Sequence, residues 1–135
     1  MMVILNDIPG ITRKEVEQLR EAGVRTIDQL LEQASTPSDR LRLADQAQLD
    51  EMQLKQWVHC ADLMRVQGLR PEVAALLYQA GVLTVPKLAF CASDSLFAEL
   101  YDLSQSQKIT HHLPTRPELG AWIAAAKRLP KLVRH

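Results

Sequence analysis

The chain repeats itself at a fixed offset of 58 residues. Most of the recurring residues are glycines or residues typical of a protein core. The matched pairs are Gly10 and Gly68, Leu19 and Leu77, Ala22 and Ala80, Gly23 and Gly81, Val24 and Val82, Thr26 and Thr84, Leu30 and Leu88, and Ala34 and Ala92. A repeat of glycines and apolar residues is a repeat of backbone geometry, so it constrains the fold more than the chemistry.

Each copy predicts a tight turn followed by two short helices. An apolar-x-Gly-apolar turn opens the copy, and Gly23 and Gly81 stand where a left-handed residue ends the first helix. Thr26 and Thr84 are well placed to cap the second helix. Hydrophobic residues make up 47% of the chain and aromatic residues only 4%, so Leu, Ala and Val must fill the core. The sequence therefore predicts an all-α fold.

A tryptophan segment follows each copy. Trp57 lies within a segment from about Asp39 to Met64, and Trp122 lies within residues 118–129. The two tryptophans are 65 residues apart, so the second copy holds seven extra residues, which we place in 108–117. We expect a turn, two helices and a connecting helix, twice over, with no helix before Ile8. The first unit with its connecting helix spans 1–64 and the second unit with its C-terminal helix spans 65–135, within one compact domain.

The two turns resemble those of helix-hairpin-helix proteins. The resemblance rests on Ile8-Pro9-Gly10-Ile11-Thr12-Arg13-Lys14, on Val66-Gln67-Gly68-Leu69-Arg70, and on the Ala-Gly-Val-x-Thr-x-x-x-Leu continuation of each. With the segment from Trp57 to Met64, the chain is similar to a bacterial family of tandem helix-hairpin-helix proteins that carries a domain-of-unknown-function label. The resemblance is strongest over residues 5–100. It implies a SAM/HhH-like fold of two units joined by a Trp-containing helix, and it implies no reaction.

Helix-hairpin-helix turns in other proteins commonly bind nucleic acid without reading its sequence. Backbone N–H groups in the turn and the positive end of the next helix face one phosphate. The candidate phosphate-binding residues are Gly10, Ile11, Thr12, Arg13 and Lys14 in the first turn and Gly68, Leu69 and Arg70 in the second. Thr12 and Arg70 stand where a second glycine is usual. Thr12 can instead form a capping box with Glu15, and we favour that interpretation.

Charge weighs against strong duplex binding. The chain has 16 Lys and Arg against 16 Asp and Glu, whereas a phosphate-binding domain usually has a basic excess. Arg13 and Lys14 keep nucleic-acid binding open, although the interleaved glutamates Glu15 and Glu17 are also typical of a solvated face with local ion pairs. The basic C-terminal run over residues 127–135 is either a solvated tail or a contact for an acidic partner or nucleic acid.

The first helix of the second copy is more apolar than its counterpart. Glu15, Glu17, Gln18 and Arg20 become Val73, Ala75, Leu76 and Tyr78. Further on, Glu32 and Gln33 become Phe90 and Cys91. A helix that is apolar nearly all round is buried on more than one side. Either neighbouring helices bury it, or Val73, Ala75, Leu76 and Tyr78 form part of a face for a protein partner or a second copy.

Catalysis finds little support. His111-His112 in a Pro-flanked loop and His59-Cys60 on an expected helix lack the spacing of a metal site, and no phosphate-cradling glycine loop is present. Asp94 and Asp102 are expected as loop or cap residues, and both tryptophans as core anchors, since base stacking would need exposed rings. We therefore expect no enzyme, no cofactor and no metal.

The sequence leaves two functions open. The first is a non-enzymatic adaptor or assembly module that binds a protein partner or a second copy of itself. The second is weak, sequence-independent binding to the nucleic-acid backbone through the two turns. The neutral charge and the two replaced glycines favour the first. The two cysteines, Cys60 and Cys91, indicate a reducing, cytoplasmic compartment, and no stretch has the length of a membrane span.

Overall fold

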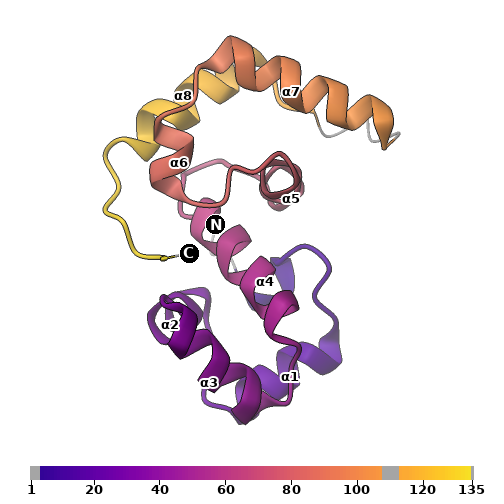
Figure 1. The fold of residues 1–135 in the computed structure, drawn as a ribbon, viewed down its shortest axis with the longest axis vertical. Helices are drawn as coiled ribbons and strands as arrows, with labels where there is room; N and C mark the ends of the chain where they lie inside the picture. Colours follow the sequence, from indigo (N-terminus) through magenta and orange to yellow (C-terminus); the bar gives the residue numbers. More distant parts are fainter. Residues whose placement is uncertain (1–3, 108–112, 135) are drawn as a thin grey trace. The chain divides into compact units, whose positions relative to one another are not determined.

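The computed structural model describes residues 4–107 and 113–134. Over these residues it is helical with no strand, so the predicted all-α fold is confirmed (Figure 1). The elements are a 3₁₀ turn η1 (Leu5–Asp7) and the helices α1 (Arg13–Glu21), α2 (Ile27–Gln33), α3 (Pro37–Ala47), α4 (Glu51–Leu63), α5 (Pro71–Gln79), α6 (Val85–Ala89), α7 (Ser93–Ser106) and α8 (Arg116–Ala126). None of these helices is long and apolar enough to cross a membrane.

The chain divides into two compact units. Unit 1 comprises Met1–Asp62 together with Leu132–His135, and unit 2 comprises Leu63–Lys131. The repeat predicts a division between residues 64 and 65, with the C-terminal residues in the second unit. The chain thus enters unit 2 near the end of α4 and returns to unit 1 after α8.

The two turns have the same backbone geometry. Gly10 has a φ of 81° and Gly68 a φ of 84°, both in the left-handed region that glycine adopts at little cost. In the first turn the N–H of Ile11 donates to the carbonyl of Ile8 at 3.2 Å. In the second, Leu69 donates to the carbonyl of Val66 at 3.1 Å. Gly10 and Gly68 therefore reverse the chain in the same way in both copies of the repeat.

The ends of α1 and α5 also match. Gly23 and Gly81 have φ values of 94° and 86°, as predicted. The next amide, that of Val24 or Val82, donates back to a carbonyl five residues earlier, at 2.8 and 2.9 Å. This is the hydrogen bond of a Schellman motif, which satisfies carbonyls that the helix end leaves open. The predicted threonine caps are also present. The Thr26 hydroxyl accepts a hydrogen bond from the amide of Gln29 in α2, and the Thr84 hydroxyl accepts one from the amide of Lys87 in α6.

The prediction of a single connecting helix after each copy is wrong. Two helices, α3 and α4, follow the first copy, and α7 and α8 follow the second. The first pair is separated at Gln48, which has a φ of 57°, and the Asp50 carboxylate then accepts the amide of Gln53. No glycine or proline marks this break. Asp102 lies inside α7 and Asp94 in its first turn, with Ala92 as the N-cap, so the prediction of a loop or cap position is wrong for both residues.

The helices α4 and α8 are counterparts at the 65-residue offset. Both tryptophans and the apolar residues around them are buried in both helices. The pairs are Leu54 and Leu119, Trp57 and Trp122, Val58 and Ile123, and Ala61 and Ala126. The change of offset from 58 to 65 falls between the end of α7 and the start of α8, where the sequence placed the extra residues. Of that stretch, residues 108–112, with His111 and His112, lie outside the described residues.

Each unit has an apolar core. In unit 1 the helices α1, α2 and α4 contribute fully buried side chains such as Leu19, Leu30 and Trp57. In unit 2, α7 and α8 pack against each other, with Leu100 and Leu119 fully buried. Burying one such leucine contributes about 1.5–3 kcal/mol, so the aliphatic side chains account for the stability that the few aromatic residues cannot supply. The tryptophans are core anchors, as predicted.

Candidate functional site

The first turn is closed by a carboxylate of its own chain. The Thr12 hydroxyl accepts the amide of Glu15 at 3.2 Å, and the Glu15 carboxylate accepts both the amide and the hydroxyl of Thr12 at 2.9 Å. The predicted capping box is thus confirmed. Because the carboxylate already takes the amide that a phosphate would use and carries the same charge, an anion at this helix end must displace it.

Two cations flank this turn. Arg13 and Lys14 are exposed in the first turn of α1. Further along α1, Arg20 forms an exposed ion pair with Glu17 at 3.4 Å, as expected of a solvated face. The turn itself is open, since a Cβ added at Gly10 would meet nothing within 4 Å. The first turn therefore combines two available cations with a carboxylate that opposes anion binding.

The second turn is covered by α8 of the same unit. The Arg70 guanidinium donates to the Glu118 carboxylate at 2.8 Å and lies 5.6 Å from the centre of the Trp122 ring. A Cβ at Gly68 would come within 3.6 Å of the indole nitrogen of Trp122. The hydrogen bond from Arg70 lowers the pKa of Glu118, and the amide of Thr115 lowers it further. Arg70, the cation of this turn, is therefore already paired with Glu118.

The apolar helix α5 is mostly internal. Val73 is fully buried and Leu76 is 5% exposed, so neither offers a surface to a partner in this structure. Ala75 and Tyr78 are half-buried. Of the four predicted face residues, the structure leaves only these two at the surface. Internal burial, the simpler of the two interpretations, accounts for Val73 and Leu76.

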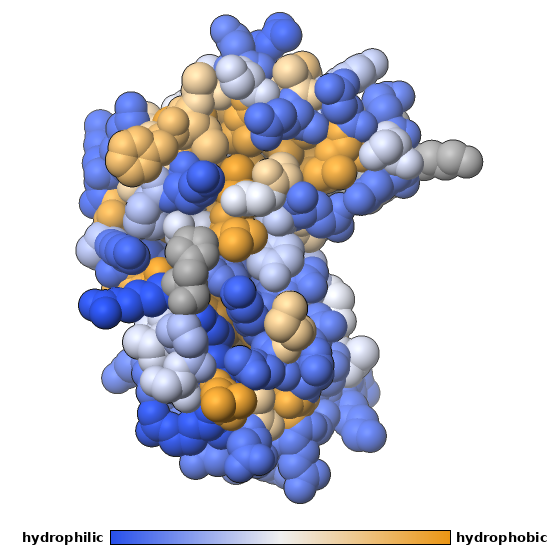
Figure 2. Space-filling model, viewed as in Figure 1, coloured by the Kyte–Doolittle hydropathy of each residue, from blue (hydrophilic) through white to orange (hydrophobic). Residues whose placement is uncertain are grey.

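Aromatic side chains are exposed elsewhere on unit 2, and sequence reasoning did not select them as site residues. Phe90 is 91% exposed at the end of α6, and Tyr101 on α7 is 47% exposed. Tyr101 stacks on Phe97 with ring centres 6.4 Å apart, and the Arg116 guanidinium lies 4.7 Å from the Phe97 ring centre. Figure 2 shows apolar side chains at the surface of this unit. The signal in the sequence was the change from Glu32 to Phe90 between the copies.

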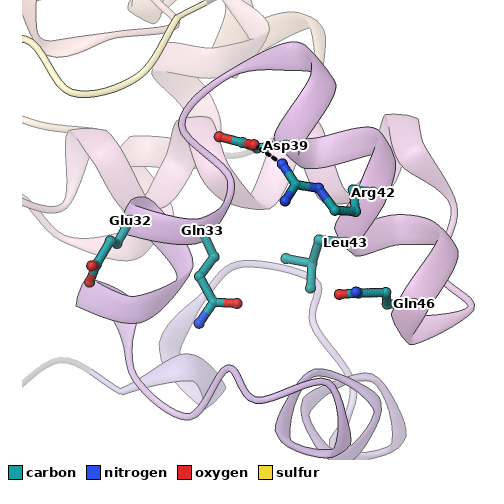
Figure 3. Close-up of a pocket in the computed structure, with 6 residues that line it drawn as sticks. All are labelled: Glu32, Gln33, Asp39, Arg42, Leu43 and Gln46. Atoms are coloured by element: carbon teal, nitrogen blue, oxygen red, sulfur yellow. Dashed lines mark hydrogen bonds and ion pairs between the residues drawn. The ribbon is translucent and has the colours of Figure 1, made fainter.

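A polar hollow lies between α2 and α3 in unit 1 (Figure 3). Its volume is about 320 Å³. It is lined by Glu32, Gln33, Asp39, Arg42, Leu43 and Gln46. The cation of this hollow, Arg42, is paired with Asp39, so no free positive charge faces the space. We assign it no ligand.

No metal-binding cluster appears among the described residues. No three His, Cys, Asp or Glu side chains there lie close enough to hold a metal ion. His59 and Cys60 lie on α4 as predicted, but both are buried. Burial raises the pKa of the Cys60 thiol to about 12, which suppresses the nucleophilic thiolate.

The fold of the described residues defines a class: proteins built from helices alone. The chain belongs to the family described as a domain of unknown function, DUF4332, whose model matches residues 9–129. The resemblance to a domain-of-unknown-function family is thereby confirmed. No curated protein and no solved structure shows a significant match to the chain.

Proposed function

We propose that the two repeats are helix-hairpin-helix units that serve as architecture, and that the protein is a non-enzymatic cytoplasmic adaptor for a protein partner. The observation that carries this proposal is the exposure of Phe90. The first repeat has a glutamate at this position, so the second repeat exchanges a solvated charge for an exposed ring. Exposed aromatic side chains are enriched among the anchors of protein interfaces.

The state of the two turns supports the same proposal. Glu15 closes the first turn and Glu118 engages the cation of the second. A carboxylate of the chain thus takes the Thr12 amide in the first turn and the Arg70 guanidinium in the second, so both turns are less available to a phosphate. A net charge of zero adds no long-range attraction for nucleic acid.

The test compares the wild-type chain with Phe90→Glu, which restores the residue type of the first repeat. The substitution removes an exposed ring, so we expect an unchanged melting temperature. Proteins captured by the wild-type chain should be lost, and binding of the purified partner should weaken at least tenfold. Gln33→Glu, at an exposed position of the first repeat, is the control for added charge and should retain the partner. Equal capture by Phe90→Glu would contradict the proposal.

The alternative function, weak binding to the nucleic-acid backbone, is favoured by one observation. Arg13 and Lys14 are exposed beside an open turn. If this turn binds phosphates, Arg13→Ala and Lys14→Ala should each weaken binding to random duplex and single-stranded DNA and lower the salt slope by about one unit. Fluorescence anisotropy at low and moderate salt measures both quantities. Equal affinity of the double variant would remove the first turn from any such site.

A further inference from the structure

Unit 1 holds the C-terminal segment as it would hold an extended peptide. The segment comprises residues 132–134, which lie beyond α8 in a stretch without helix or strand (Figure 1). The amide of Arg134 donates to the carbonyl of Ser35 at 2.7 Å, and the carbonyl of Arg134 accepts from the Arg40 guanidinium at 2.7 Å. Between these contacts and α8, the Val133 side chain is fully buried in the core of unit 1.

We call the site that the segment occupies in unit 1 the groove. Arg40 makes this groove selective for a main-chain carbonyl. It belongs to α3, is 2% exposed, and also donates to the carbonyl of Ala34 at 3.0 Å. Desolvation lowers the pKa of Arg40, and the nearby charges of Glu51 and Asp39 oppose that shift. A buried guanidinium needs hydrogen-bond acceptors, and the tail supplies one of them. Unit 1 without the tail would therefore retain a donor aimed at the place of a missing carbonyl.

Only one side chain of the segment is enclosed. Leu132 is 44% exposed and Arg134 is exposed, whereas Val133 is not accessible. Recognition thus rests on main-chain hydrogen bonds and one branched apolar side chain, which is the chemistry by which proteins hold extended segments. The same groove would accept this segment from any chain that can deliver it.

We propose that a second copy of the chain can supply this segment, so that two chains exchange their tails. Leu63–Lys131 forms a unit of its own, so the tail can leave unit 1 without unpacking the helices of unit 2. Arg65 in unit 2 donates to the carbonyl of Pro130 at 2.7 Å, and this contact just before the segment is retained in either arrangement. Exchange of an identical element keeps every local contact and changes only the chain that provides it. The proposal needs no outside partner, so it stands or falls separately from the adaptor function.

A complementation experiment tests the exchange. Val133→Asp keeps the groove and spoils the tail, whereas Arg40→Met keeps the tail and spoils the groove. Neither variant can close its own groove or exchange with itself, so each should have the mass of one chain by light scattering. When the two are refolded together, one intact groove meets one intact tail, and a species of twice that mass should form. Adding Leu132→Asp to the Arg40→Met chain, at an exposed neighbour, should leave this species in place.

A second measurement uses the wild-type chain and does not depend on variants that fold. Sedimentation at rising concentration should show a growing dimer fraction. A free peptide spanning residues 129–134, in tenfold excess, should reduce that fraction at least twofold. The same peptide carrying Val133→Asp should not. If no dimer forms in the wild type or in the mixture of folded variants, or if both peptides act equally, tail exchange is wrong.

Discussion

At the scale of single residues, the backbone conformation of four glycines defines the repeat. Gly10, Gly23, Gly68 and Gly81 all have φ between 81° and 94°. An L-residue with a side chain is strained there by about 1–2 kcal/mol. Gly23 isolates this effect, because a Cβ added to it would meet nothing within 4 Å. The cost of a substitution there therefore comes from the backbone alone.

We predict that Gly23→Ala lowers the free energy of unfolding by about 1–2 kcal/mol. Gly120 is the matched control, since it lies in α8 without a positive φ and also has free space around a Cβ. Gly120→Ala should raise the free energy of unfolding by about 0.5–1 kcal/mol. Urea unfolding of both variants measures the two changes. Shifts of the same sign would contradict the assigned conformations.

Residue-level prediction succeeded where chemistry is local and failed where it is not. The capping role of Thr12 and the left-handed glycines follow from neighbours within a few positions. The burial of Arg40 depends on a segment 94 residues away, so local pattern could not reveal its partner. One signal was present: Arg40 shares the i, i+3, i+4 stripe of α3 with Leu43 and Ala44, which are also buried.

At the scale of elements, α8 is fixed to the start of α5 by a pair that the sequence did not predict. Arg70 and Glu118 are 48 residues apart, and their side chains are 39% and 38% exposed. An ion pair this exposed contributes about 0.2–1 kcal/mol. The helix break at Gln48 was missed for a different reason. The residue adopts a left-handed conformation without being glycine, so composition gives no sign of it.

We predict that Glu118→Gln destabilises the chain by about 0.5 kcal/mol at pH 7 and has little effect at low pH. The folded protein holds the pKa of Glu118 below the ordinary value of 4.5. A depressed carboxyl pKa contributes stability that is complete above the ordinary value and is lost as the pH falls through the folded value. Urea unfolding of wild type and variant between pH 7 and pH 3 measures the difference. A double-mutant cycle with Arg70→Gln assigns it to the pair, and a difference that grows toward pH 3 would contradict the assignment.

At the scale of the whole molecule, the chain is two compact units through which it passes in the order one, two, one. The repeat predicted the helical content of the described residues. It could not predict the return of the tail, because Val133 has no counterpart in the 58-residue repeat and its burial depends on tertiary contacts. It also could not separate buried Val73 from exposed Phe90, since both are apolar replacements of a glutamate.

The reactivity of the two free cysteines tests whether the structure around each of them opens in the native protein. Cys60 on α4 is 1% exposed, and desolvation raises its pKa from 9.0 to about 12. That shift alone lowers its thiolate fraction at pH 8 by about a thousandfold. Cys91 is half-buried, and its pKa is raised by desolvation and by Glu99 and lowered by Lys87. We therefore predict that a thiol reagent modifies Cys91 in the native protein and Cys60 only when the chain unfolds.

The measurement is the number of thiols that react per chain at pH 8, with and without denaturant. The native wild type should react at one thiol in an early phase, and Cys91→Ser should lose that phase. Cys60→Ser is the matched control and should keep it. Since α4 carries the chain from unit 1 to the edge of unit 2, slow labelling of Cys60 means that this helix opens only with the structure around it. Comparable rates at both cysteines in native buffer would show that α4 opens on its own.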